Sequence, residues 1–313
     1  MQQMRHSFFS FLFLLLLVVP VYETCKADEM SIKAGKIFDL CYQFKFISAD
    51  SLMNSYFITM KNGEELELNL LQANVLWWKI ISGLNDKITI QNYYKTLDKA
   101  EFYFQKEKET SNAYLYKATT LYGYLARMDG MNKNYLKALF RLNSCIKYLE
   151  KSFGSETKYP FFYLTSGLYN YHIVAAQKQY PIITPYLWLY PKGNKAKGIE
   201  QLKMAASNQN KYLSTEAQYF LMKLYLEEKN YNEAMNYANI LHQKFPNNAI
   251  FMYYHFLLSL KLKMNNEARI EAEKLLENLK NNKEINSIQI KHFEQLLDHD
   301  LKAFHQKKYK HEI

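Results

Sequence analysis

Apolar residues recur at intervals of three and four along most of the chain, in blocks of about 12 to 20 residues that short polar links separate. Glycine and proline, which interrupt helices, number only nine and six in 313 residues. No stretch shows the sustained alternation of apolar and polar residues that is typical of half-buried strands. The pattern therefore predicts an all-α chain. Helices are expected over residues 30–45, 48–60, 64–82, 89–107, 110–128, 133–152, 158–178, 194–207, 214–228, 231–244, 248–263, 266–280 and 284–306.

A repeat with a period of 34 residues lies in the C-terminal part of the chain. Ala234 and Ala238 of one repeat correspond to Ala268 and Ala272 of the next. Small side chains let two helices approach to about 8 Å, and each pair can then stack on the following pair. The period predicts an α-solenoid of antiparallel helix pairs. The clearest repeats are residues 215–248 and 249–282.

This spacing resembles the tetratricopeptide repeat (TPR). Leu221 and Tyr225 would face inward on the first helix of a pair, Ala234 and Ala238 would lie where two helices touch, and Pro246 would close the unit. The second repeat departs from the family pattern because it lacks the proline. The resemblance implies a TPR-like repeat domain over 28–282.

Two stretches carry a more specific resemblance. "SGLYNYHIVAAQKQYPIITPYLWLYPKGNKAKGIEQLKMAA", residues 166–206, and "LLQANVLWWKIISG", residues 70–83, are similar to hallmark segments of a family of exported bacterial tetratricopeptide proteins. A more remote similarity is to eukaryotic helical-repeat proteins implicated in clearing mitochondrial inclusion bodies. The resemblance implies a fold and a binding role, and it implies no reaction.

Two glycines, Gly193 and Gly198, have the spacing of a phosphate-binding loop. Such a loop needs a lysine and a hydroxyl residue next, where this chain has Ile199 and Glu200. The sequence therefore argues against a nucleotide site. We expect Gly198 at the close-contact position of a repeat helix, with Gly193 in the turn before it.

The N-terminus has the composition of a secretory signal peptide. Arg5 lies in a short basic start, residues 8–19 are apolar, and Pro20 follows. The apolar stretch is shorter than the roughly 18 to 20 residues that span a bilayer, although an N-terminal membrane anchor is an alternative. We expect a signal peptide over 1–27, with cleavage near 24–27, or a lipid attached at Cys25. The mature protein is then exported to the periplasm, the outer membrane or the extracellular space.

Residues suited to catalysis or metal binding do not form a recognisable pattern. Cys41 and Cys145 could form a disulfide, although a chain of this size does not need one. His292 and His299 share a helix face, but the helix rise separates them by roughly 10 Å. The sequence therefore predicts a protein that is not an enzyme and that has no cofactor and no metal.

The net charge of +10 comes from lysines spread along the chain. Only the end of the C-terminal segment 283–313, which is expected to be a capping helix and a basic tail, is locally basic. We interpret this tail as solvated, with contact to anionic lipid or polysaccharide as the alternative. Nucleic acid is not an expected partner of an exported chain.

The 27 tyrosines and 20 phenylalanines are an unusual surplus. Those in the two family-like stretches could line a concave groove for a partner, or they could pack in the core and hydrogen-bond between helices. We expect a scaffold that binds a protein or peptide on its concave face. The alternative is an outer-membrane lipoprotein, lipidated at Cys25, in glycan binding or envelope assembly. The candidate partner-binding residues are Asn74, Trp77, Trp78, Tyr169, Asn170 and Tyr171.

Overall fold

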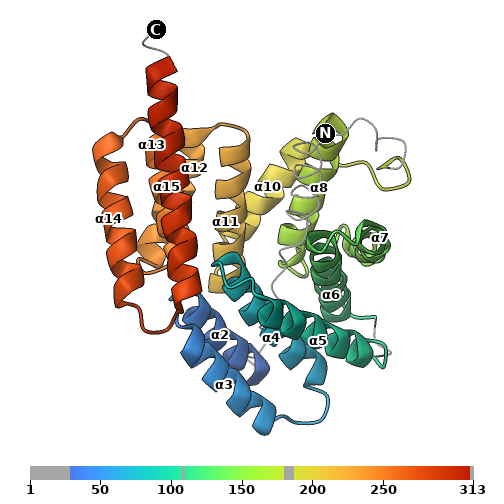
Figure 1. Cartoon of the computed structure of the whole chain (residues 1–313). Coiled ribbons are helices and arrows are strands. Elements are labelled where there is room, and N and C mark those ends of the chain that lie inside the picture. The colour runs from blue at the N-terminus through green and yellow to red at the C-terminus, as the bar shows by residue number, and fades with distance from the viewer. Residues whose placement is uncertain (1–28, 108–109, 180–186, 311–313) are drawn as a thin grey trace. The chain divides into compact units, whose positions relative to one another are not determined.

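The computed structural model describes residues 29–107, 110–179 and 187–310, without the side chains of 178–179 and 303–310. Within these residues the chain is all-helical and contains no strand, which confirms the predicted fold class (Figure 1). The helices are α2 (Glu29–Tyr42), α3 (Phe46–Ile58), α4 (Glu65–Ile81), α5 (Lys87–Phe104), α6 (Asn112–Met131), α7 (Tyr135–Ser152), α8 (Phe162–Gln179), α10 (Lys195–Ala206), α11 (Lys211–Glu227), α12 (Tyr231–Lys244), α13 (Ala249–Lys261), α14 (Asn265–Asn281) and α15 (Ser287–Lys310).

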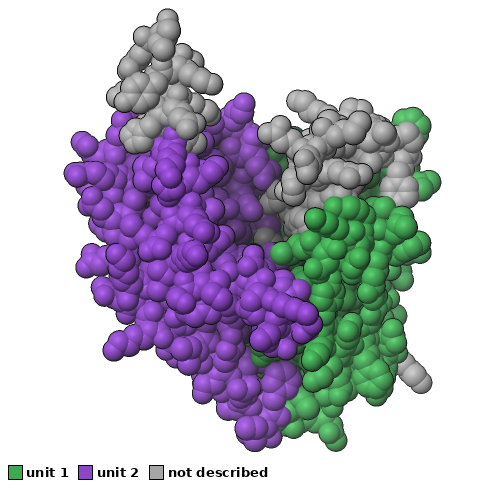
Figure 2. All heavy atoms as spheres, in the orientation of Figure 1, with its two compact units in different colours: residues 1–34, 60–74, 93–217 green, residues 35–59, 75–92, 218–313 purple. Residues whose placement is uncertain are grey.

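The helices divide into two compact units, which Figure 2 shows in different colours. Unit 1 consists of the described residues within 1–34, 60–74 and 93–217. Unit 2 consists of those within 35–59, 75–92 and 218–313. Helices α2, α4, α5 and α11 therefore supply residues to both units.

In unit 1, α6 packs against α7, and α8 packs against α10. The buried side of α7 carries Ala138, Leu142, Cys145 and Leu149, which recur at three- and four-residue steps and so lie on one face. This face joins Ile173 and other residues of α8 in one apolar cluster. Burial of the cluster is what holds these helices together.

In unit 2, α13 packs against α12 on one side and α14 on the other, and α15 packs against α13 and α14. Figure 1 shows α12, α13 and α14 next to one another in chain order, with α15 in front of them. Ala234 and Ala238 on α12 and Ala268 and Ala272 on α14 are all buried, as the repeat predicts. Neighbouring helices that pack in chain order give each unit an α-solenoid-like character.

One turn recurs between successive helices. Lys133, Lys229 and Lys263 have positive φ angles of 63°, 61° and 62°, and each follows the end of a helix. After α11, the backbone N–H of Lys229 donates to Leu226 O at 3.1 Å, and that of Asn230 donates to Tyr225 O at 2.9 Å. This pair of bonds satisfies the last carbonyls of the helix and reverses the chain direction.

Several predicted helix boundaries differ from the structure by up to four residues, and two of these differences have clear local reasons. Residues 30–45 were expected to be one helix, but α2 ends at Tyr42 because Phe44, with a φ of 58°, turns the backbone out of the helix. The last helix was expected at 284 and begins at Ser287. Asn286 sets this start, because its Oδ1 accepts from the N–H groups of Ile288 at 3.0 Å and Gln289 at 3.1 Å.

The glycine pair of the α8–α10 region has the predicted packing role. A Cβ on Gly198 would lie 2.7 Å from both the Gly167 carbonyl oxygen and the Tyr171 backbone nitrogen. A Cβ on Gly193 would lie 1.9 Å from Cγ2 of Ile173. The missing side chains therefore allow α8 and α10 to touch through their backbones. In the described part of the chain, no helix combines the length and apolar character needed to cross a membrane.

Candidate functional site

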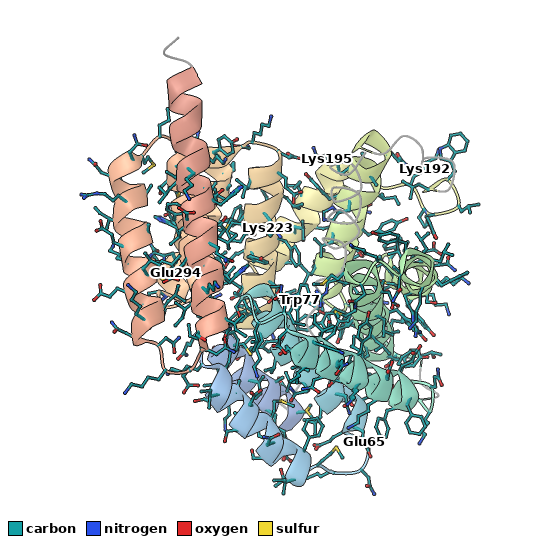
Figure 3. The ribbon with its side chains drawn as sticks, viewed as in Figure 1. Glu65, Trp77, Lys192, Lys195, Lys223 and Glu294 are labelled. Carbon is teal, nitrogen blue, oxygen red and sulfur yellow. The ribbon has the colours of Figure 1, made fainter. Side chains whose placement is uncertain are left out.

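The six residues predicted to bind a partner are all buried, with 2 to 9% of each side chain exposed. Asn74, Tyr169, Asn170 and Tyr171 belong to unit 1. Trp77, which Figure 3 labels, and Trp78 belong to unit 2. These six buried residues are therefore divided between the two units.

Asn170 forms hydrogen bonds inside unit 1 with both the nitrogen and the oxygen of its side-chain amide. Its Nδ2 donates to Gln201 Oε1 at 2.8 Å, and Gln201 Nε2 in turn donates to Glu156 Oε1 at 3.2 Å. Its Oδ1 accepts from the backbone N–H of Asn194 at 3.2 Å. Asn194 is the N-cap of α10 and accepts from the N–H of Lys197 at 3.0 Å. Asn170 therefore fixes the start of α10 against α8.

Three other predicted residues, Asn74, Tyr169 and Trp78, also have partners inside the protein. Asn74 donates to the Tyr124 hydroxyl at 3.1 Å, and the Tyr169 hydroxyl donates to the Pro191 carbonyl oxygen at 2.7 Å. Trp78 packs edge-on against Tyr42, with ring centroids 5.1 Å apart. The interpretation as core packing and interhelix hydrogen bonding agrees with this burial, and their role in partner binding stays a prediction. Cys25, the predicted lipidation site, lies outside the described residues.

A hollow of about 770 Å³ lies in unit 2, at one end of α12, α13 and α14 beside the α2–α3 turn. Side-chain amides are the most frequent polar groups in its lining, and lysines are the next. The lining residues are Gln43, Lys45, His242, Pro246, Asn247, Met252, Lys274, Glu277, Asn278, Asn281, Asn282, Lys283 and Glu284.

The 34-residue repeat places two asparagine pairs at this end of unit 2. Asn247 and Asn248 follow α12, and Asn281 and Asn282 stand one period later at the end of α14. Asn247 and Asn281 line the hollow and are exposed. Asn278 Nδ2 donates to Asn247 Oδ1 at 3.0 Å, so that the two repeats are linked across the hollow's lining.

Glu284 uses its carboxylate to hold the neighbouring helix α3. Oε2 accepts from the Ser48 backbone N–H and Oε1 accepts from the Ser48 hydroxyl, both at 2.8 Å. Burial acts to raise the pKa of Glu284, but these hydrogen bonds and the nearby Lys45 ammonium hold the pKa below its ordinary value. This carboxylate is therefore ionised and engaged at neutral pH.

A group of titratable side chains stands next to the hollow. Glu271 on α14 is buried, and its Oε2 lies 3.7 Å from both His242 Nε2 on α12 and His255 Nδ1 on α13. Lys274 donates to the other carboxylate oxygen at 3.2 Å. The two imidazole rings stack with centroids 5.2 Å apart.

The protonation of His255 follows from its partners. Its Nε2 lies 2.8 Å from Asn239 Oδ1, an oxygen that can only accept, so Nε2 carries the hydrogen. Burial lowers the pKa of His255 and outweighs the opposing effect of Glu271, while His242 and Lys274 lower it further. His255 is therefore neutral at neutral pH.

The described residues contain no metal site and no disulfide. Across the described residues, no group of three or more His, Cys, Asp or Glu side chains is positioned to hold a metal ion. Cys41 and Cys145 are both buried and are not bridged. Burial raises the pKa of the Cys145 thiol to about 12, so its nucleophilic thiolate form is scarce at neutral pH.

The hollow was not predicted, although the sequence contains a pattern that corresponds to it. The asparagine pairs recur with the 34-residue period, as the alanines do. The alanine positions are expected from helix contact, whereas an asparagine after a helix is common in any turn. Only the arrangement of the α2–α3 turn beside both pairs makes the recurrence meaningful.

No family model matches the chain, and comparisons with curated proteins and with solved structures also find no match.

Proposed function

We propose that the chain is an exported, non-enzymatic TPR-like scaffold that binds an extended segment of a protein partner in the hollow of unit 2. The support for a repeat scaffold is the 34-residue period together with the packing of successive helices in chain order. The resemblance of residues 70–83 and 166–206 to exported tetratricopeptide proteins supports the binding role.

The amide-rich lining of the hollow carries the proposal. An asparagine side chain offers both hydrogen-bond donors and acceptors, as does each peptide unit of an extended polypeptide. Asn247 and Asn281 are exposed at equivalent places in two repeats, and Asn278 lies between them on α14. Such a row can bind a main chain without requiring one side-chain sequence.

The charges of the hollow favour an acidic partner segment. Lys45, Lys274 and Lys283 line it, with Glu277 and Glu284 as the carboxylates. Glu284 keeps its negative charge although Ser48 binds it, and Lys274 also pairs with Glu271, so the lysines of the lining exceed its carboxylates by one at most. Attraction between opposite charges then speeds association and selects against basic partners.

Site-specific photocrosslinking in cells tests this proposal. A photoreactive residue at Glu277 or Lys283, both exposed in the hollow, should capture one protein species, and peptide mapping should place the crosslink in an acidic segment. A probe at Arg269 is the matched control, because it is exposed on the same helix and outside the lining. The proposal predicts no capture of this species from Arg269.

A substitution in the hollow then tests whether the amides do the binding. Asn278→Ala together with Asn281→Ala should reduce capture from Lys283 by at least about tenfold, since each lost hydrogen bond contributes roughly 1 kcal/mol. Unchanged capture by this variant, with unchanged helicity in circular dichroism, would contradict the proposal. Equal capture from Arg269 would contradict it as well.

The proposed export needs its own test, because residues 1–28 lie outside the described structure. N-terminal sequencing of the protein isolated from its native cell should give a start near residues 24–27. Cys25→Ala separates the two forms of export, because a lipoprotein would leave the membrane fraction when this cysteine is lost. A start at Met1 would contradict export by a cleaved signal.

A further inference from the structure

Unit 1 exposes two large apolar side chains on the connection before α10. Trp188 and Leu189 are each 75% exposed. Leu187 on one side is buried in the α7–α8 cluster, and Tyr190 on the other side packs against the same cluster. The Tyr190 hydroxyl also lies 3.5 Å from Asn143 Oδ1 on α7. The buried residues on both sides therefore fix the connection with Trp188 and Leu189 pointing outward.

Helix α7 carries a second exposed apolar pair. Leu136 is 75% exposed and Phe140 is 73% exposed, and their spacing of four residues puts them on one helix face. Asn143 stands three residues after Phe140 on this face, so the Tyr190 contact brings the Trp188 connection to the face that bears Leu136 and Phe140. Four unusually exposed apolar side chains thus belong to one surface of unit 1, which we call the apolar surface.

Lysines are the main charged residues of the two stretches that carry the apolar surface. Within 133–151 and 187–197, Glu150 is the one exposed acidic residue. Figure 3 labels Lys192 and Lys195, which stand in the turn after Pro191 and at the start of α10. The exposed lysines of these two stretches are Lys133, Lys137, Lys147, Lys151, Lys192, Lys195 and Lys197.

We propose that the apolar surface of unit 1 docks on an anionic lipid bilayer. Proteins that bind at a membrane interface typically insert Trp, Phe and Leu side chains at the boundary between headgroups and acyl chains. Lysines beside these side chains lie at the headgroups. Anionic headgroups attract the lysines, and this attraction adds to the burial of apolar area. Side chains exposed in this way do not stabilise the core, and a patch of them on a protein surface indicates a binding surface.

The lysines beside the apolar side chains favour an anionic bilayer over a second copy of this chain, which itself has a net charge of +10. Protein interfaces place their main anchors in well-packed pockets of the partner, with a matching contour around them. A described hollow of unit 1 is lined by Tyr163, Glu200 and Lys203, and by none of the four apolar residues. A fluid bilayer accepts protruding side chains without a matching contour, and it supplies the negative charge that the lysines require.

Tryptophan fluorescence gives a direct test, because the chain has three tryptophans and two of them are buried. The full chain with Cys25→Ala, which excludes a lipid at that position, is mixed with vesicles of phosphatidylcholine alone or with phosphatidylglycerol added. We expect a blue shift of the emission, and quenching by brominated acyl chains, only with the anionic vesicles. Trp188→Phe should abolish this shift while leaving vesicle binding nearly unchanged.

Variants then separate this surface from other parts of the chain. Trp188→Ser together with Leu189→Ser should weaken cosedimentation with anionic vesicles by about tenfold or more, because two apolar side chains are lost. Ile47→Ser with Ile58→Ser is the matched control, since these α3 residues of unit 2 are also exposed, by 60% and 85%. The control should bind as the parent chain does. The apolar residues 8–19 are present in every variant, so any vesicle binding of their own adds equally to each, and the test is the difference between variants.

Three results would overturn the proposal. The first is an unchanged emission of the parent chain with anionic vesicles. The second is equal vesicle binding by the Trp188→Ser, Leu189→Ser variant and the parent. The third is a parent chain that does not bind vesicles but self-associates, with the self-association lost when Trp188 is replaced. The apolar surface would then join two protein molecules. Weaker binding at high salt, by contrast, is expected from the lysine contribution.

Discussion

Asn248 and Asn282 hold the same α2–α3 turn from two successive repeats of unit 2. The Asn248 amide donates to the Tyr42 carbonyl oxygen at 2.9 Å, and the Asn282 amide donates to the Phe44 carbonyl oxygen at 3.2 Å. Each also caps the segment that follows it, with Asn248 Oδ1 accepting from Ile250 N at 3.0 Å and Asn282 Oδ1 from Glu284 N at 2.9 Å. One residue type thus performs the same two tasks a repeat apart.

We predict that Asn248→Ala destabilises the protein by about 2 to 4 kcal/mol, because it removes a helix cap and leaves a buried carbonyl without its donor. Asn248 is completely buried, so water cannot replace the lost bond. Asn278→Ala is the control, since its bond to Asn247 is exposed and its loss should cost less than about 0.5 kcal/mol. Urea unfolding measures both changes. Equal effects would show that the bond to Tyr42 does not stabilise unit 2.

Gly198→Ala should destabilise the protein by about 2 to 3 kcal/mol, because a Cβ there overlaps backbone atoms of α8 that cannot rotate away. Thermal unfolding followed by circular dichroism checks this. Ala196→Ser tests the same helix at an exposed position and should leave the midpoint almost unchanged. A Gly198→Ala variant as stable as the parent would mean that α8 and α10 can separate at little cost.

Lys229→Gly should stabilise the protein by about 1 kcal/mol, because a residue with a Cβ is strained at positive φ and glycine is not. Lys263→Gly should do the same in the next repeat. Lys229→Ala is the control for the lost charge and should give no gain. If Lys229→Ala stabilised the protein as much as Lys229→Gly, the effect would come from charge and not from the backbone.

Stability should fall as the pH drops below about 6.5, the ordinary pKa of histidine. Burial lowers the pKa of both His255 and His292 in the folded state, so the unfolded chain takes up protons first on acidification. The contribution of these histidines is complete above the ordinary pKa and is lost as the pH falls through the lowered folded value. Near His255, Glu271 acts against this loss, whereas His242 and Lys274 add to it, because Glu271 raises the pKa of His255 and the other two lower it.

The variant His255→Gln, His292→Gln should show a smaller loss of stability between about pH 7.5 and 5 than the parent chain. Urea unfolding at both pH values gives the comparison, and the difference between the two chains removes the titration of carboxylates common to both. A steeper pH dependence in the variant would mean that the histidines are stabilised by protonation, opposite to the direction expected from their burial.

The helices and the Gly198 contact were predictable because each depends on a local pattern. Apolar residues at three- and four-residue steps mark the buried face of α7, and a glycine at the repeat's close-contact position marks a helix crossing. The turn at Lys229 was located from its polar residues, but its left-handed backbone was not predicted, because lysine has no preference for that conformation.

The candidate site was less predictable for a different reason. Asn170 and Asn247 have the same side chain, but one is consumed by Gln201 and Asn194 inside unit 1 while the other is exposed in a hollow. The sequence shows that a residue is asparagine, but it does not show which groups its amide will hydrogen-bond in the folded protein. The hollow also depends on Lys45 and Asn282, which are more than two hundred positions apart in the sequence. Local sequence patterns do not predict contacts between residues so far apart.

The bonds from Asn248 to Tyr42 and from Asn282 to Phe44 span 206 and 238 positions of sequence. During synthesis, the α2–α3 turn leaves the ribosome long before either asparagine exists. Unit 2 therefore cannot close before residue 282 has been synthesised, and its earliest helices stay only partly assembled until then. The export proposed above needs a chain that is still unfolded, and this delay would provide it.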